Sequence, residues 1–247
     1  MTIPPHEIRT YQAHQFPGIK RLDGKLDKAP WNECAWSEDF VDIEGDIRPK
    51  PRFRTRMKMF WADEGTETDG LYIAAEMEEP NLWATLTKRD SVIFHDNDFE
   101  VFIDPDNDGY AYSELEINQL NTQWDLLLIR PYREQGRGVD GWDIKGLRSA
   151  VHLDGKLNDP SVKCKGWSIE IHIPWHPLHE ISKGDSPPKP GDQWKINFSR
   201  VEWHVDVVDG KYVKRPGLKE DNWVWSPQGI VDMHLPHEWG LVEFVKS

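Results

Sequence analysis

The chain has 247 residues, with 43 acidic against 30 basic side chains and a formal net charge of −13 at pH 7. This charge argues against nucleic acid and anionic membranes as partners, since both need a basic surface. No apolar run has the length of a transmembrane helix, and the N-terminal residues lack a basic segment followed by an apolar stretch. We therefore expect a cytoplasmic protein, or a secreted or periplasmic one if a leader was removed.

Residues 1–17 are predicted to form an N-terminal arm, and residues 18–247 a single domain. Runs rich in β-branched and aromatic residues recur between turn signals, which is typical of an all-β sandwich. We predict a two-sheet antiparallel β-sandwich of the jelly-roll type with little helix. A short helix is expected at Trp83–Arg89, and loops at Gln135–Asp143 and Lys183–Asp192. The predicted strands are Arg52–Trp61, Leu71–Met77, Asp98–Asp104, Tyr112–Asn118, Trp124–Ile129, Leu147–Leu153, Trp167–Ile173, Trp194–Glu202, Trp223–Ser226 and Leu241–Val245.

The predicted hairpin over residues 98–118 is the most informative stretch. Its first strand alternates between apolar side chains on one face and Glu100 with Phe102 on the other. Its second strand places Glu114, Glu116 and Asn118 opposite its own apolar side chains. Carboxylates on one sheet face repel each other unless something satisfies them, and a polyhydroxyl ligand would do so. A solvated face is the alternative.

Thirteen tryptophans are far more than this length usually carries. Most are expected in the core, where a large aromatic side chain packs well. An exposed Trp offers a flat apolar platform for the C–H-rich face of a sugar ring. The composition therefore favours a carbohydrate ligand without establishing it.

Seven motifs in order resemble the family 9 carbohydrate-binding modules and their stand-alone relatives, which share a DOMON-like β-sandwich. The resemblance runs from Ile19 to Phe244, and its motifs are IKRLDGKLDKAPW, DGLYIAAEM, DNDFEVFIDPDNDGYAYSELEIN, GWSIEIHIPW, WKINFSRVEW, NWVWSPQ and HLPHEWGLVEF. It implies non-catalytic binding of an oligosaccharide or polysaccharide end, in carbohydrate catabolism, by a monomer or weak homodimer.

In the sugar-binding members of this family two aromatic side chains clamp the terminal sugar, and the matching positions here are Phe94 and Trp225. The family's strand glutamate matches Glu100, and Asn118 also matches. The chain departs from the family at Glu116, where the sugar binders place an arginine. Arg200 follows the core parity of its strand, so it either pairs with Glu100 or Glu116 or directs its guanidinium at ligand hydroxyls. The predicted ligand-binding residues are Phe94, Glu100, Glu116, Asn118, Arg200 and Trp225.

The turn of the hairpin spells D-x-D-x-D-G, with Asp104, Asp106 and Asp108 at alternate positions before Gly109. Three carboxylates spaced in this way can converge on one hard cation, and glycine permits a sharp turn. Some members of the resembled family bind structural calcium, so a structural Ca²⁺ is a candidate here. The alternative is an ordinary Asp/Asn/Gly hairpin turn.

Three other functions are open. Glu100, Glu114 and Glu116 could supply the carboxylate pair of a glycoside hydrolase or lyase, but nothing in the pattern separates an acid from a base, so binding is preferred. A haem-binding domain would need methionine and histidine ligands, and Met57, Met59 and Met77 are the candidates, although Met in a strand is usually core. A metal site at His172, His176 and His179 would need a continuous helix, which Pro174 and Pro177 argue against.

Overall fold

The computed structural model describes residues 6–63, 65–184 and 186–246. Each of the ten predicted strands coincides with a strand of the structure. The strands are β1 (Thr10–Gln15), β2 (Val41–Asp42), β3 (Thr55–Ala62), β4 (Gly70–Glu78), β5 (Asp98–Asp104), β6 (Tyr112–Asn118), β7 (Gln123–Leu128), β8 (Gly138–Val139), β9 (Arg148–Asp154), β10 (Gly166–Ile173), β11 (Gln193–Glu202), β12 (Val205–Val208), β13 (Lys211–Lys214), β14 (Asp221–Val224) and β15 (Gly240–Val245).

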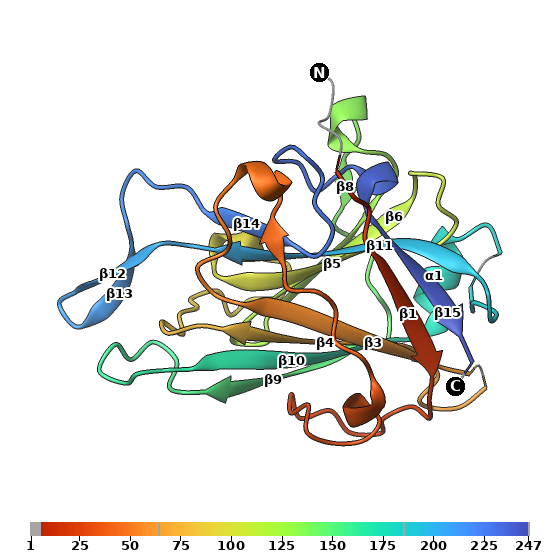
Figure 1. Cartoon of the computed structure of the whole chain (residues 1–247), viewed down its shortest axis with the longest axis horizontal. Coiled ribbons are helices and arrows are strands. Elements are labelled where there is room, and N and C mark those ends of the chain that lie inside the picture. The colour runs from red at the N-terminus through yellow and green to blue at the C-terminus, as the bar shows by residue number, and fades with distance from the viewer. Residues whose placement is uncertain (1–5, 64, 185, 247) are drawn as a thin grey trace.

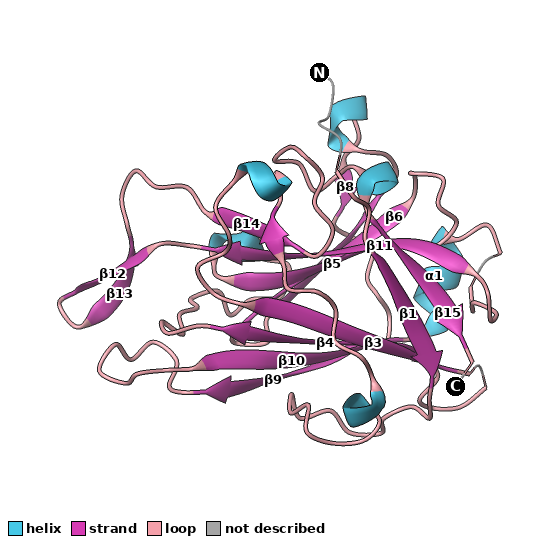
Figure 2. Cartoon of the chain, in the orientation of Figure 1, coloured by secondary structure: helices cyan, strands magenta, loops and turns pink. Residues whose placement is uncertain are grey.

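Helix is scarce in the described residues, and the helical segments lie at the periphery of the strands (Figure 2). They are α1 (Trp175–Ile181) and the short 3-10 turns η1 (Trp31–Glu33), η2 (Gly45–Ile47), η3 (Ile93–His95), η4 (Tyr132–Glu134) and η5 (Pro236–Glu238). The all-β class is therefore confirmed. Within the part of the chain that the structure describes, no helix has the length and apolar character needed to cross a membrane.

The two layers of the fold belong to one continuous sheet, which corrects the prediction of two separate sheets. Its strand order is β8-β7-β6-β5-β11-β15-β1-β3-β4-β10-β9, with β14 and β2 attached beside β11. The sheet curls so that β5, β6 and β11 form one layer and β3, β4, β9 and β10 the other (Figure 1). A separate two-stranded sheet, β12 and β13, projects from the end of this body.

The β1 strand joins the two layers, because it pairs in parallel with both β15 and β3. It lies inside the segment predicted as an N-terminal arm. Tyr11 and Ala13 are buried in the main core. Residues 10–15 are therefore an integral strand, and these parallel pairs also depart from the purely antiparallel sheet that was expected.

The main core lies between the two layers and takes the apolar side chains that alternate along each strand. Phe99, Val101 and Ile103 of β5 point into it, as their parity predicts. Cys34 and Cys164 are free and buried, so no disulfide supports the fold.

The predicted helix at residues 83–89 is wrong, whereas no continuous helix of the described residues carries His172, His176 and His179, as expected, because His172 lies in β10. Residues 83–89 do not form a helix, because the backbone N–H groups of Thr85 and Leu86 donate to the Asp96 carboxylate, at 2.7 and 2.8 Å, instead of to a preceding turn. Helix α1 forms despite two prolines. Pro174 is its N-cap and Pro177 lies in its first turn, where a missing N–H costs no intrahelical hydrogen bond.

Candidate functional site

The polar face of the β5–β6 hairpin points away from the main core, as predicted. Cross-strand pairing sets Glu100 opposite Glu116 and Phe102 opposite Glu114. These three carboxylic side chains are nonetheless buried, with exposed fractions of 4% for Glu100, 6% for Glu114 and 1% for Glu116. The face is therefore not the solvated surface that was the alternative.

Burial comes from a second apolar cluster on this outer face. Phe102, Tyr112 and Leu126 pack there against Met233 and Trp239, which belong to the C-terminal segment of residues 231–239. The ring centroids of Tyr112 and Trp239 lie 5.1 Å apart in an edge-to-face arrangement, which favours aromatic contact. This C-terminal segment covers the acidic side chains from one side.

A pocket of about 420 Å³ remains open above these carboxylates, within the range of small-ligand sites. We call it the acidic pocket. Its lining residues are Ile43, Phe94, Glu100, Phe102, Glu114, Glu116, Trp124, Tyr132, Val201, Glu220, Asn222, Val231, Asp232, Met233 and His234.

Aromatic side chains form part of the lining of the acidic pocket. The Phe94 and Trp124 ring centroids lie 6.4 Å apart with a tilt of 32° between the ring planes. The backbone of Phe94 is fixed on both sides: its N–H donates to the Glu116 carboxylate at 2.8 Å, and its carbonyl accepts from the Trp203 indole N–H at 2.8 Å. The acid and the aromatic ring are thus positioned together.

The carboxylates hold their protons more strongly than free side chains do. Burial raises the pKa of Glu100 to about 7. Burial, and then the charge of Glu100, also raise the pKa values of Glu114 and Glu116 well above their usual range. Burial lowers the pKa of His234 to about 4, so this neighbouring ring is neutral at pH 7.

Trp225 is a core residue, which corrects its predicted role as a sugar platform. Its side chain has no exposed surface, and it packs against Tyr11 and Phe198 with centroid distances of 6.5 and 5.9 Å. It does not line the acidic pocket. Phe94 and Trp225 therefore do not face each other across a cleft in this structure.

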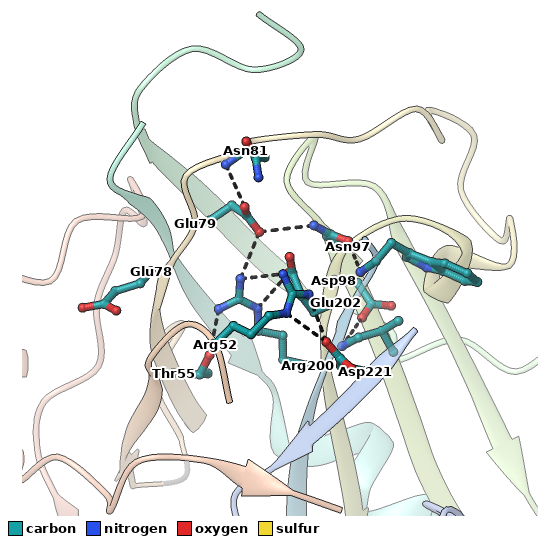
Figure 3. Close-up of polar contacts among 12 residues, drawn as sticks. Arg52, Thr55, Glu78, Glu79, Asn81, Asn97, Asp98, Arg200, Glu202 and Asp221 are labelled. Carbon is teal, nitrogen blue, oxygen red and sulfur yellow. Dashed lines mark hydrogen bonds and ion pairs between the residues drawn. The ribbon is translucent and has the colours of Figure 1, made fainter. Parts of the chain in front are cut away.

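Arg200 is also structural, and its partners differ from those predicted. Its guanidinium contacts Glu79 at 3.0 Å and Glu202 at 2.9 Å, and it donates to the Thr55 hydroxyl at 3.0 Å (Figure 3). Neither Glu100 nor Glu116 pairs with it. An arginine with no exposed surface needs such partners, because an unpaired buried charge is strongly destabilising.

Asn118 supports the neighbouring turn instead of lining the pocket. Its amide donates to the Leu86 carbonyl at 2.8 Å and to Asp96 at 3.0 Å, and its oxygen accepts from Leu120 and Thr122. Of the six predicted ligand-binding residues, the structure brings together three at the acidic pocket: Phe94, Glu100 and Glu116.

Sequence reasoning missed the other aromatic residues of the pocket. Trp124 lies directly opposite Glu116 on β7, so strand pairing extended by one strand would have found it. Tyr132 lies in η4, and His234 lies in the segment 231–239 that covers the carboxylates. No local sequence pattern predicts that either residue lines the pocket. Glu114 is predicted on the polar face of the hairpin and as a catalytic alternative, but it is not among the six predicted ligand-binding residues.

The acidic turn does gather its three aspartates. One ligand atom from each of Asp104, Asp106 and Asp108 lies within 4.8 Å of the others. The Oδ1 atom of Asp104 is buried without a hydrogen-bond partner, and burial raises the pKa of this residue to about 7. The Lys183 ammonium already contacts Asp108 and lies 3.7 Å from Asp106. The donor set suits a hard cation, which would compete with this lysine.

The residues of the haem and histidine-metal alternatives have other contacts. Met57, Met59 and Met77 lie in the main core. His172 is held by the Asp69 carbonyl, 2.7 Å from its Nε2, and by Arg148, whose Nε donates to its Nδ1 at 3.1 Å. His176 pairs with Glu180 on the exposed face of α1. These positions give no support to either site.

Comparison with known proteins agrees with the fold and the family expected from the motifs. The family model described as "Carbohydrate family 9 binding domain-like" matches residues 22–188. A candidate carbohydrate-binding protein from Bacteroides uniformis, known from its crystal structure, superposes with a TM-score of 0.67 at 16% identity, covering 96% of this chain and 100% of that one. No curated protein matches the sequence. At this identity the structural match establishes the fold alone.

Proposed function

Since the chain belongs to the carbohydrate family 9 binding domain-like family, we propose that it binds a glycan and does so in the acidic pocket. The observation that carries this proposal is the juxtaposition of aromatic rings with carboxylates. Phe94 and Trp124 can stack on the C–H face of a sugar, while Glu100, Glu114 and Glu116 accept hydrogen bonds from its hydroxyl groups. Hydrogen bonds from ligand hydroxyl groups favour the ionised form of these buried acids, and a bond to an ionised carboxylate is stronger than a neutral one.

The family's aromatic clamp is not reproduced as expected, because Trp225 belongs to the core. Trp124 and Tyr132 offer aromatic surface near Phe94 instead, on the same side of the sheet. We infer that Phe94, Trp124 and Tyr132 hold the ligand, and that one end of a glycan chain enters the pocket.

Binding is preferred to hydrolysis because, among the described residues, no lysine or arginine pairs with one of these acids to keep it ionised while another keeps its proton. Acid–base chemistry requires one protonated and one ionised group, with environments that push their pKa values apart. Here burial raises the pKa values of Glu100, Glu114 and Glu116 in the same direction. The oligosaccharide should therefore remain uncleaved through long incubation, and the release of reducing ends by the wild type but not by Glu116→Gln would favour an enzyme.

A glycan array followed by calorimetry tests the proposal. Tyr132→Ala should weaken binding, because Tyr132 lines the pocket, whereas Tyr110→Ala should not. The two tyrosines make a matched pair, with exposed fractions of 46% and 44%. Trp124→Ala should abolish binding without loss of fold. Equal affinities of the Tyr132 and Tyr110 variants, with binding intact in Trp124→Ala, would place the glycan elsewhere.

We further propose that the turn of Asp104, Asp106 and Asp108 holds a structural Ca²⁺. The support is the convergence of three carboxylates and the buried Asp104 oxygen that lacks a partner. The ion would neutralise the turn and displace Lys183 from Asp108. It would take no part in sugar recognition, since these aspartates do not line the acidic pocket.

A further inference from the structure

We propose that the acidic pocket is specific for a glycan end that carries a free, protonated amino group, as in a glucosamine residue without its acetyl group. This inference rests on the proposed function and names the ligand's chemical class. It is carried by the juxtaposition of buried carboxylates, without a basic partner, and aromatic rings in one pocket.

Glu100, Glu114 and Glu116 lack a cationic side chain as a partner in the described part of the chain. Among the described residues, no lysine or arginine nitrogen lies within 4 Å of Glu100, Glu114 or Glu116. The nearest basic group is the His234 ring, 4.0 Å from Glu114, and it is uncharged at pH 7. A buried carboxylate needs a cationic partner or a metal to stay ionised, and without one it keeps its proton. A ligand cation would supply the partner that Glu100, Glu114 and Glu116 lack.

The acidic pocket differs from four other surface pockets of the described residues in having no lysine or arginine in its lining. Its lining contains five acidic residues and no lysine or arginine, although one of the five, Asp232, pairs with Arg133 at 2.7 Å from outside the lining. Four other surface pockets each contain a lysine or an arginine, with Lys58 in one and Arg52 in another. The acidity therefore does not simply reflect the net charge of the whole chain.

A buried oxygen close to two carboxylates of the pocket has no hydrogen-bond partner, although its residue is not part of the lining. Asp98 has no exposed surface, and its Oδ2 atom has no hydrogen-bond partner. Ligand atoms of Asp98, Glu100 and Glu116 lie within 4.8 Å of one another. A group with several N–H donors would satisfy this arrangement, and a primary ammonium has three.

The aromatic lining and the size of the pocket favour an organic cation over a bare metal ion. Aromatic faces attract an ammonium group by cation–π interaction, and Phe94, Trp124 and Tyr132 provide such faces. A volume of about 420 Å³ accommodates a sugar ring, whereas a metal ion would leave most of it empty. The ammonium is thus placed at Glu100 and Glu116, with the ring against the aromatic side chains.

The experiment is calorimetry at pH 7 with three oligosaccharides of equal length: glucosamine oligomers, their N-acetylated forms and neutral cello-oligomers. Glucosamine oligomers should bind at least about tenfold more tightly than the other two, as expected for a hydrogen-bonded charge pair. Glu116→Gln and Glu100→Gln should each remove that preference. Glu33→Gln, which changes the net charge equally at an exposed site outside the pocket, should retain it.

Some results would overturn the amine preference and leave glycan binding intact, and another would overturn both. Equal binding of neutral and amino oligomers, unchanged in Glu116→Gln, would leave a glycan site without selection for an amine. Saturable Ca²⁺ binding that Glu116→Gln abolishes, with no preference for the amino oligomers, would assign the carboxylates to a metal. If no saccharide binds at all, the proposed function falls together with the inference.

Discussion

Removing the Trp225 side chain should destabilise the fold without acting directly on the pocket. This indole is fully buried between Tyr11 and Phe198, so Trp225→Ala leaves a cavity in the main core. Substitutions of this kind cost about 3–5 kcal/mol in the free energy of unfolding. For a chain of this length, each kcal/mol lowers the melting temperature by about 2–4 °C, which gives a fall of roughly 6–20 °C.

Gly240 makes the prediction sharper, because it lies directly against this ring. A Cβ atom built on Gly240 would lie 2.1 Å from Cζ3 of Trp225, far inside van der Waals contact. Gly240→Ala alone should therefore cost about 1–3 kcal/mol or more through overpacking. In the Trp225→Ala background the methyl group enters the cavity, so the second substitution should cost much less, with a coupling energy of about 1–3 kcal/mol.

Urea unfolding of the wild type, both single variants and the double variant measures this coupling. Trp36→Ala is the control, since Trp36 is only partly buried and lies outside both the main core and the acidic pocket. It should lose less stability than Trp225→Ala. Additive effects of the two substitutions, or an unchanged melting temperature for Trp225→Ala, would refute the core position of Trp225 and restore it as a candidate sugar platform.

Three further predictions concern buried charge. Between pH 4.5 and about 7 the wild type should lose stability as pH rises, because folded Glu100, Glu114 and Glu116 keep protons that the unfolded chain releases. Glu100→Gln should reduce this slope in thermal melts without removing it, and should raise stability at pH 8. Arg200→Ala should cost about 3–5 kcal/mol in urea unfolding by leaving Glu202 unpaired, and a smaller cost when Glu202→Gln is added would confirm the pairing. Chelation should lower the melting temperature relative to Ca²⁺, and Asp106→Asn or Asp108→Asn should abolish the difference; identical wild-type melts would exclude the ion.

The strands could be predicted because their signal is local. The β5 and β6 boundaries agree with the sequence to the residue, since a largely alternating pattern of apolar and polar side chains is interrupted by turn residues between the two strands. The position of Trp225 had no such signal. Trp223, Val224 and Trp225 are buried in succession at the end of β14, so alternation says nothing about which face each one takes.

The partner of Arg200 could not be predicted for a different reason. Parity correctly placed its side chain on the core side, where a carboxylate was required. Glu79 directly follows β4 and is 121 residues away along the chain, and only the folded structure brings its carboxylate to the Arg200 guanidinium on β11 (Figure 3). Contacts of this separation depend on the curl of the sheet, which no short pattern specifies.

In the acidic pocket, the polar face of a strand pair becomes a candidate ligand site because its carboxylates are buried, and residue type alone would not make it one. Glu100, Glu114 and Glu116 would be an ordinary solvated face if residues 231–239 did not cover them. Burial of like charges raises their pKa values and costs free energy that Glu→Gln substitution would recover. Sites that bind ligands commonly retain such local conflicts, because removing them stabilises the fold and weakens function. Glu116→Gln should therefore shift stability upward and amino-sugar affinity downward, a pair of opposite effects that a merely structural carboxylate would not produce.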